Sequence, residues 1–543
     1  MKPVTDSKDL VKGAMILTLA ALVTKILSAI YRVPFQNIVG DIGFYIYQQV
    51  YPFYGIVMVL STYGFPVVIS KLYTEQQARG NSGRADRMLA ISLLFLGLVG
   101  LLLFSIFYFG SDWIAEKIGD SELSLLFKVV SVPFLIFPIT SVYRGYFQGK
   151  GNMVPTAVSQ VSEQLIRVAT ILILSALFIQ QGYSLYFAGA GAVFGSVTGG
   201  LISVAVLSYF YLKNRTVNPF RHYKAKTLFA DAAWVVKALV VQGFAISISG
   251  MLLILFQLAD SLNMYTALLE TGLAGDEAKS AKGIFDRGQP LIQLGTVVAT
   301  SMSLSLVPAI SGEKSRNRTD VILQKIRLAL QTSLLFGAGA AAGLYSIIVP
   351  ANIMLFENAD GSNVLGALSL MILLGSVILT ITSILQGLNK TIFPAFVILA
   401  GFGLKYGLNL IFIPREGAMG AAYATLLAML IILVVLVARL RVELGKPVLS
   451  LRFMAKILFS SAVMSIFLYF YLQITDFLYR YVEPDRLAAI IQALSAVAFG
   501  AIVYLIVLIK TKALNEEELL TLPFGSRLVQ LFLNKTGGSR NDK

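Results

Sequence analysis

Long apolar segments recur along almost the whole chain and constrain its fold more than any other feature of the sequence. Each has about 18–28 mostly apolar residues, enough for one α-helix to cross the roughly 30 Å hydrocarbon core of a bilayer. We predict fourteen membrane-spanning helices, at residues 11–33, 44–70, 88–110, 124–147, 154–179, 184–212, 233–262, 288–310, 326–350, 363–388, 392–413, 417–438, 453–474 and 487–510. The sequence therefore predicts an all-α polytopic membrane protein.

The composition points to the same class. Hydrophobic residues make up 57% of the 543 residues and charged residues only 13%, whereas soluble domains carry about 25% charged residues. The chain has no cysteine, which excludes disulfides and thiol catalysis. Its formal net charge of +15 would suit nucleic acid, but the basic residues lie in short loops between apolar segments. We therefore expect the protein to contact membrane lipids and not to bind nucleic acid.

The basic loop residues predict the orientation. If the N-terminus is cytoplasmic, the segments on that side hold thirty lysines and arginines, and the opposite loops hold seven. Cytoplasmic loops of membrane proteins carry such an excess. This asymmetry predicts an even number of spans, with both termini in the cytoplasm.

Two short patterns recur six predicted helices apart. Both YRGYFQGKGNMVPTA (143–157) and ILQGLNKTIFPA (384–395) contain Gln-Gly, a short turn with a cation, and a proline that begins the next helix. The repeat predicts two six-helix lobes and two further helices, and repeated lobes around a midplane site are a common transporter plan. The predicted parts are an N-lobe (1–212), a cytoplasmic linker (213–232), a C-lobe (233–440), two extra helices (441–512) and a cytoplasmic tail (513–543).

The first apolar segment carries two cations, Lys25 and Arg32. Seven residues are nearly two helical turns, so both side chains leave one face of the helix, roughly 10 Å apart along its axis. A charge near the bilayer centre costs about 2.5–3.5 kcal/mol on insertion scales, which makes such residues functional candidates. We interpret this face as the wall of a cationic central cavity. The alternative is that the side chains snorkel to the membrane surface.

Further polar residues lie inside predicted helices. Glu163 and Arg167 are four residues apart, a spacing that allows an ion pair, either in the cavity or as a packing contact. Asp260 and Lys405 are further interior charges, and the basic residues outnumber the acidic ones at this depth. Tyr45 and Gln48 belong either to the cavity or, as the aromatic residues of this stretch suggest, to an interfacial belt.

Catalytic motifs are absent from the sequence. The single histidine, His222, lies in the basic linker, and no metal-ligand spacing, P-loop or nucleophile elbow is present. We therefore expect a transporter without cofactor or metal, driven by a coupling ion, a substrate gradient or the membrane potential. Arginine and lysine in its cavity would suit a phosphate-bearing substrate.

YRGYFQGKGNMVPTAVSQVSEQLIRV (143–168) resembles the MurJ/SpoVB-like polysaccharide-export branch of the MOP flippase superfamily, especially its Gram-positive MurJ type. FDRGQPLIQLGTVVATSMSLSLVPAIS (285–311) and the fourteen-helix pattern extend the resemblance over nearly the whole chain. The resemblance implies a MATE-like fold in a bacterial plasma membrane. It also implies flipping of lipid II, the undecaprenyl-pyrophosphate-linked peptidoglycan precursor, with the cell-wall synthesis machinery as a further candidate partner.

The resemblance also implies site residues. Family members use essential arginines in the first helix and at the start of the eighth, and the matching positions here are Lys25, Arg32 and Arg287, with Asp286 beside the last. Lys25 departs from the arginine of many relatives, which keeps the charge but loses bidentate geometry.

Five functions remain open from the sequence, two of which it disfavours: a membrane glycosyltransferase, for which no sizeable extracytoplasmic loop is present, and a non-catalytic scaffold for the wall-synthesis machinery, which would leave the interior cations unexplained. Of the other three, the first is a lipid II flippase, with the pyrophosphate bound by the cationic residues. The second is a flippase for another lipid-linked oligosaccharide, such as a spore-cortex, capsule or teichuronic precursor. The third is a multidrug–cation antiporter, which the positive interior disfavours because it would repel cationic substrates.

Overall fold

The computed structural model describes residues 7–214, 225–315, 319–445 and 450–513. These residues form helices joined by short turns, and among them there is no β-strand. The predicted all-α membrane fold is confirmed.

The first part of the chain forms nine α-helices. They are α1 (Ser7–Ile30), α2 (Arg32–Val59), α3 (Phe65–Ala78), α4 (Ser82–Phe109), α5 (Ser111–Ile118), α6 (Ser124–Ser131), α7 (Pro133–Gly149), α8 (Val154–Gln180) and α9 (Leu185–Asn214). A π-helical turn, η1 (Leu60–Gly64), joins α2 to α3, and a 3-10 turn, η2 (Ser121–Leu123), precedes α6.

The remaining described helices follow after the linker. They are α10 (Ala225–Ala238), α11 (Phe244–Gly250), α12 (Leu252–Leu269), α13 (Gly275–Asp286), α14 (Gly288–Gly295), α15 (Val297–Ser315), α16 (Thr319–Ser346), α17 (Ile348–Phe356), α18 (Ser362–Ser369), α19 (Met371–Gly387), α20 (Ile392–Glu416), α21 (Ala418–Leu444), α22 (Leu451–Thr475), α23 (Leu478–Tyr481) and α24 (Asp485–Lys510). A second π-helical turn, η3 (Leu239–Gly243), joins α10 to α11.

Every one of the fourteen predicted segments is helical, but length and hydropathy mark thirteen candidate spans among the described residues. The first candidate, Met15–Ala78, covers the first two predicted segments. The seventh predicted segment is divided at Met251 into two candidates, and the eighth, which corresponds to α14 and α15, is not among the thirteen.

Gly40 separates the first two predicted spans. Its backbone has φ 68° and ψ −175°, a conformation that is essentially restricted to glycine. The chain reverses there, so that Tyr31 and Arg32 on one side of the turn lie beside the tyrosines of α2 on the other. The charge pattern predicts that this end of the molecule faces the outside, and it is called the outer end below.

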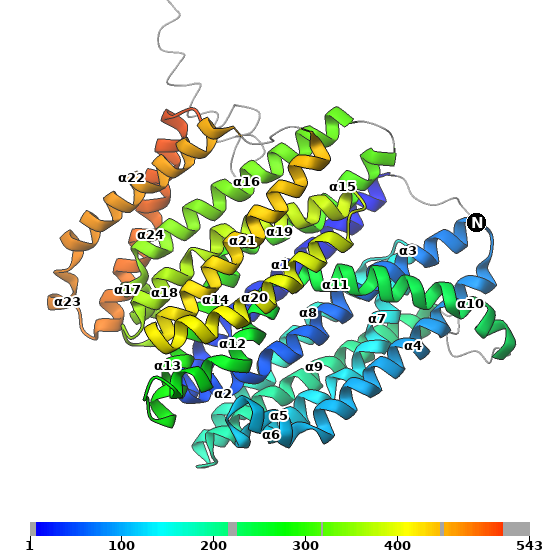
Figure 1. Ribbon diagram of the computed structural model, residues 1–543, viewed down its shortest axis with the longest axis horizontal. Coiled ribbons are helices and arrows are strands. Elements are labelled where there is room, and N and C mark those ends of the chain that lie inside the picture. The colour runs from blue at the N-terminus through cyan, green and yellow to red at the C-terminus, as the bar shows by residue number, and fades with distance from the viewer. Residues whose placement is uncertain (1–6, 215–224, 316–318, 446–449, 514–543) are drawn as a thin grey trace, which may run out of the picture.

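We call α1–α9 the first helix group and α10–α21 the second helix group, and Figure 1 shows α1 running where the two groups meet. α1 packs on α8 on one side and on α14 and α15 on the other, and α2 contacts α12, α13 and α17. α22 and α24 lie at the edge of the molecule, where they pack against α16 and α17 (Figure 1). The exact lobe and linker boundaries remain a prediction, and residues 1–6, 215–224 and 514–543 lie outside the described part.

The two π-helical turns pack against the partner helices of the opposite group: η1 contacts α11, and η3 contacts α3. A Cβ added to Gly64 would overlap Oγ of Ser247, so this approach requires glycine. Single π-turns inside helices are frequent at functional sites and at bends. The contacts of η1 with α11 and of η3 with α3 therefore lie where both chain segments contain a π-helical turn.

We expect Gly64→Ala to separate these helices. Overpacking costs about 1–3 kcal/mol, enough to change a two-state ratio at least about fivefold. Because the chain has no cysteine, spin labels can be attached at the exposed positions Glu75 and Arg441. The interlabel distance should lengthen in the variant and recover in Gly64→Ala/Ser247→Gly; an unchanged distance in the single variant would contradict the role of this contact.

Candidate functional site

Two arginines, Arg32 and Arg167, lie fully buried among tyrosines at the centre of the first helix group. The Arg32 guanidinium lies 4.3 Å from the ring centroid of Tyr51, and that of Arg167 lies 4.8 Å from the ring of Tyr54. The ring of Tyr31 lies within 6.0 Å of Arg32 and 5.5 Å of Arg167. We call Arg32, Arg167 and these three tyrosines the arginine–tyrosine cluster.

The local sequence explains this cluster. Tyr47, Tyr51 and Tyr54 follow one another at spacings of four and three, so they share one face of α2. The Gly40 reversal brings that face to Tyr31, whose hydroxyl lies 2.8 Å from the Tyr47 hydroxyl. Arg167 enters from α8, which packs on both α1 and α2.

The two guanidinium groups keep unused donors. Nε and Nη2 of Arg32 and all three side-chain nitrogens of Arg167 make no well-aligned hydrogen bond to the described residues. Nη1 of Arg32 donates to Oε1 of Gln293 on α14 at 3.3 Å, which links the two helix groups. Buried polar groups normally have partners, and a buried charge without a counter-ion is costly. Two such cations, both beside the rings of Tyr31 and Tyr51, could hold an anion.

Arg144 and Glu163 form the neighbouring ion pair. Nη2 of Arg144 lies 2.7 Å from Oε2 of Glu163, and the remaining donors reach Ser159, Thr62, Ser203 and the Ser61 carbonyl. Glu163 is thus paired with Arg144 and not with Arg167. Arg144 lies at the end of the predicted span 124–147, is fully buried and was missed as a site residue, although its aromatic flanks, Tyr143 and Tyr146, were a visible signal.

Arg287 makes a different contact from Arg32. Its Nη2 lies 2.6 and 2.7 Å from the two carboxylate oxygens of Asp41, and its Nη1 donates to Oδ1 of Asn358 at 2.7 Å. Gln36 also donates to Asp41, at 2.9 Å. This pair joins α2, just after the Gly40 turn, to the junction of α13 and α14 at the outer end, and we call it the outer gate. Asp41 was missed as a site residue, although an acid between Gly40 and an apolar segment was a visible signal.

The other residues proposed for the substrate site are not gathered with Arg32. Asp286 is paired with Lys282 on α13 at 2.7 Å. Lys25 is partly buried on α1, and no hydrogen bond or ion pair joins it to a described residue. The structure therefore brings Arg32 together with Arg167, while Asp286 and Arg287 are held by other side chains.

Tyr45 and Gln48 are both buried inside the protein, so neither belongs to a lipid-facing belt. The Tyr45 hydroxyl donates to Asp120 at 3.1 Å. Asp120 also accepts from Tyr186 at 2.7 Å, and Lys279 on α13 approaches it at 3.8 Å. This second contact between the helix groups lies, like the outer gate, at the outer end.

Asp260 and Lys405 form a buried pair in the second helix group. Nζ of Lys405 lies 2.6 Å from Oδ2 of Asp260, and both side chains are 1% exposed. Asn409 donates to Oδ1 of Asp260 at 3.0 Å. In the described part of the chain, no three histidine, aspartate or glutamate side chains are grouped as a metal site would need.

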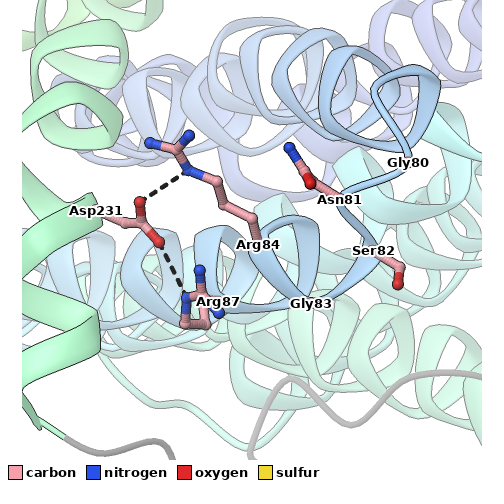
Figure 2. Close-up of a pocket in the computed structure, with 7 residues that line it drawn as sticks. All are labelled: Gly80, Asn81, Ser82, Gly83, Arg84, Arg87 and Asp231. Carbon is pink, nitrogen blue, oxygen red and sulfur yellow. Dashed lines mark hydrogen bonds and ion pairs between the residues drawn. The ribbon is translucent and has the colours of Figure 1, made fainter.

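An open pocket of about 510 Å³ lies at the opposite end, between α4 and α10. Figure 2 shows Arg84 and Arg87 reaching from α4 to Asp231 on α10, with Nε–carboxylate distances of 2.8 and 3.0 Å. Asn81 and Ser82 line another part of this pocket. It is a surface feature, separate from the arginine–tyrosine cluster.

Comparison with known proteins identifies the family. The family model described as "Polysaccharide biosynthesis protein" matches residues 10–313, more than half of the chain. The chain belongs to this family. It is 43% identical over 517 residues to the uncharacterized membrane protein YabM of Bacillus subtilis, covering 95% of both chains.

Two further relatives from Bacillus subtilis carry functional names. The chain is 27% identical to lipid II flippase MurJ, covering 91% of this chain and 94% of that protein. It is also 27% identical to stage V sporulation protein B, covering 95% and 98%. The family match and these relatives identify the protein as a MurJ/SpoVB-like transporter and not an enzyme.

Solved structures share the fold. The inward closed conformation of lipid II flippase MurJ matches with a TM-score of 0.66 at 16% identity, covering 91% of this chain and 98% of that one. An inward-facing MATE family multidrug transporter of the MOP superfamily matches with a TM-score of 0.59 at 15% identity, covering 81% and 98%. The MOP fold predicted from the sequence is thus confirmed.

Proposed function

We propose that the protein flips a lipid-linked oligosaccharide, and specifically lipid II, from the inner to the outer leaflet of a bacterial plasma membrane by alternating access. The observation that carries the proposal is the pair of buried arginines with unused donors, Arg32 and Arg167. The relative named lipid II flippase MurJ supports this class of cargo.

A pyrophosphate fits the arginine–tyrosine cluster chemically. Guanidinium groups bind phosphate oxygens through paired, charge-assisted hydrogen bonds. An anion between Arg32 and Arg167 would supply a counter-charge and acceptors for Nε and Nη2 of Arg32 and for the three side-chain nitrogens of Arg167. The tyrosine rings already stabilise the guanidinium groups through cation–π contacts, each worth about 0.5–2 kcal/mol.

Lys25 and Arg287 complete the proposed path. Lys25 lies on α1, seven residues before Arg32 and on the predicted cytoplasmic side of it, where a point charge would attract the incoming head group. Arg287 is held by Asp41 in this conformation. When the outer gate opens, Arg287 is released and joins Arg32 in guiding the pyrophosphate outward, while the polyprenyl chain stays in the lipid.

The closed outer gate and the full burial of Arg32 and Arg167 describe a state that is not open to the outside. Transport therefore requires the two helix groups to move apart at the outer end and together at the inner end. Such rocking of bundles around a fixed site is the usual form of alternating access.

A flippase for another undecaprenyl-linked glycan is the second candidate, because the identity to stage V sporulation protein B equals that to MurJ. Depletion in cells that lack other flippases separates the two. Cell-wall arrest and lysis, rescued by this chain, support lipid II. Normal growth with loss of one surface or spore polymer, also rescued by this chain, supports the second candidate and would contradict the lipid II assignment.

A further inference from the structure

Glutamine side chains continue from the arginine–tyrosine cluster into the second helix group. Nη1 of Arg32 donates to Oε1 of Gln293 on α14 at 3.3 Å. Gln289 lies one turn before Gln293 on the same face of this helix. Nε2 of Gln257, on α12, donates to Oε1 of Gln289 at 2.8 Å. The polar contacts therefore reach from α2 through α14 to α12.

A fourth glutamine connects this row back to the first helix group. Gln49 lies on α2, and its Nε2 donates to the Ser261 carbonyl of α12 at 3.2 Å. Ser261 lies one turn after Gln257 on α12. On α14 the glutamines begin two residues after Arg287 of the outer gate and end at the residue that contacts Arg32, so they lie between the gate and the anion site. We call these four residues the amide row: Gln49, Gln257, Gln289 and Gln293.

Two amides of the row are incompletely hydrogen-bonded. Gln49 is fully buried and Gln257 is 7% exposed, yet the Oε1 atom of each has no hydrogen-bond partner among the described residues. Buried polar groups normally have partners, and a buried acceptor without a donor destabilises the protein. A leucine of similar size would pack between the helices without that penalty. The two empty oxygens therefore point to a ligand that brings hydroxyl or N–H donors.

The amide row suits a different part of the head group from the arginines. A pyrophosphate offers only acceptors, so it fits the guanidinium donors and not the empty amide oxygens. A sugar carries hydroxyl groups, which can donate to these oxygens. In a lipid-linked oligosaccharide the first sugar is attached directly to the pyrophosphate. A head group whose pyrophosphate lies between Arg32 and Arg167 therefore places that sugar beside the glutamines that continue from Arg32.

We propose that the amide row is a sugar-binding subsite of the transport path, and that Gln49 and Gln257 distinguish a glycosylated lipid from bare undecaprenyl pyrophosphate. This subsite rests on the proposed function, because it serves the same head group. In the present conformation the contacts of Gln49 and Gln293 join the two helix groups. When the groups separate, hydroxyl groups of the first sugar replace these contacts and also donate to the empty oxygens. A lipid without the sugar leaves the amides unpaired, which is how a polar site rejects a ligand that lacks a hydroxyl group.

The experiment compares two lipids that differ by one sugar. The purified full-length protein is titrated with undecaprenyl pyrophosphate and with the same lipid bearing one N-acetylhexosamine. We expect Gln49→Leu and Gln257→Leu each to weaken binding of the glycosylated lipid about three- to tenfold, the effect of losing a neutral hydrogen bond. Both arginines are kept, so the affinity for undecaprenyl pyrophosphate should stay within about twofold of the wild-type value. The two substitutions lie on different helix groups, so either one decides the question if the other prevents folding.

Gln492→Leu is the matched control. Gln492 is 3% exposed on α24, outside the amide row, and its amide donates to Oγ1 of Thr475 at 3.0 Å. This variant should leave both affinities unchanged. Equal weakening of both lipids by the row variants would make the row a structural contact between the helix groups, and unchanged affinities for both would show that it contacts no sugar. Either result overturns the subsite and leaves the anion site intact, whereas a wild-type protein that binds neither lipid would contradict the anion site and the subsite together.

Discussion

Replacing Arg167 with glutamine is expected to abolish flipping while leaving the cargo-free protein at least as heat-stable as the wild type. Arg167 is fully buried, and none of its three side-chain nitrogens has a well-aligned partner among the described residues. Removing an uncompensated buried charge relieves a desolvation cost. Removing its charge-assisted hydrogen bonds to a pyrophosphate loses about 1.5–3 kcal/mol each, or roughly ten- to hundredfold in affinity.

The measurement is the binding of undecaprenyl pyrophosphate to the purified protein, alongside its melting temperature. Arg144→Gln is the matched control, because Arg144 is equally buried but paired with Glu163. Breaking one partner of a buried pair costs about 3–5 kcal/mol, so this variant should melt at a lower temperature. If Arg167→Gln lowered the melting temperature as much as Arg144→Gln and left binding intact, Arg167 would be a structural residue.

Reversing the charges of the outer gate is expected to separate gate function from cargo binding. Asp41→Asn removes the counter-charge of the buried Arg287, which again costs about 3–5 kcal/mol. We expect the outer end to open, with a longer distance between spin labels at the exposed positions Ser121 and Asn363, on the two helix groups. The double variant Asp41→Arg/Arg287→Asp should shorten that distance again.

A flipping measurement on the double variant Asp41→Arg/Arg287→Asp distinguishes two roles of Arg287. If Arg287 serves only the gate, the reversed pair should restore flipping as well as closure. If Arg287 also guides the pyrophosphate, closure returns but flipping stays impaired, because an aspartate then stands on the path; this is the result we expect. Restored flipping in the reversed pair would remove Arg287 from the cargo path.

The apolar segments predicted the positions of the helices well because each span must satisfy its own backbone in the bilayer. The reversal at Gly40 lies between the predicted spans 11–33 and 44–70, where the sequence already placed a loop. The break at Met251 between α11 and α12 was not visible from hydropathy, because the composition does not change there. Local conformation and tertiary packing decide these points.

The ion-pair partner of each charged residue was harder to predict than its position inside a membrane-spanning helix. The interior positions of Arg32, Arg167, Asp260 and Lys405 followed from the sequence, but Arg287 and its partner Asp41 are separated by 246 positions. Arg144 and Lys282 were not predicted as site residues because they lie near the ends of apolar segments, yet both are buried. These long-range contacts decide which cation has no ion-pair partner. The lack of such a partner is what distinguishes Arg167 from the other buried arginines that the sequence placed inside the membrane.

The most direct test of the central claim uses purified protein in vesicles that contain fluorescent lipid II in the inner leaflet. A membrane-impermeant quencher reports its arrival in the outer leaflet. We expect time-dependent quenching with the wild-type protein, little above the protein-free rate with Arg32→Gln or Arg167→Gln, and wild-type behaviour with Asp476→Asn, in an exposed turn. Quenching by both arginine variants at the wild-type rate would contradict the buried anion site as the cargo site.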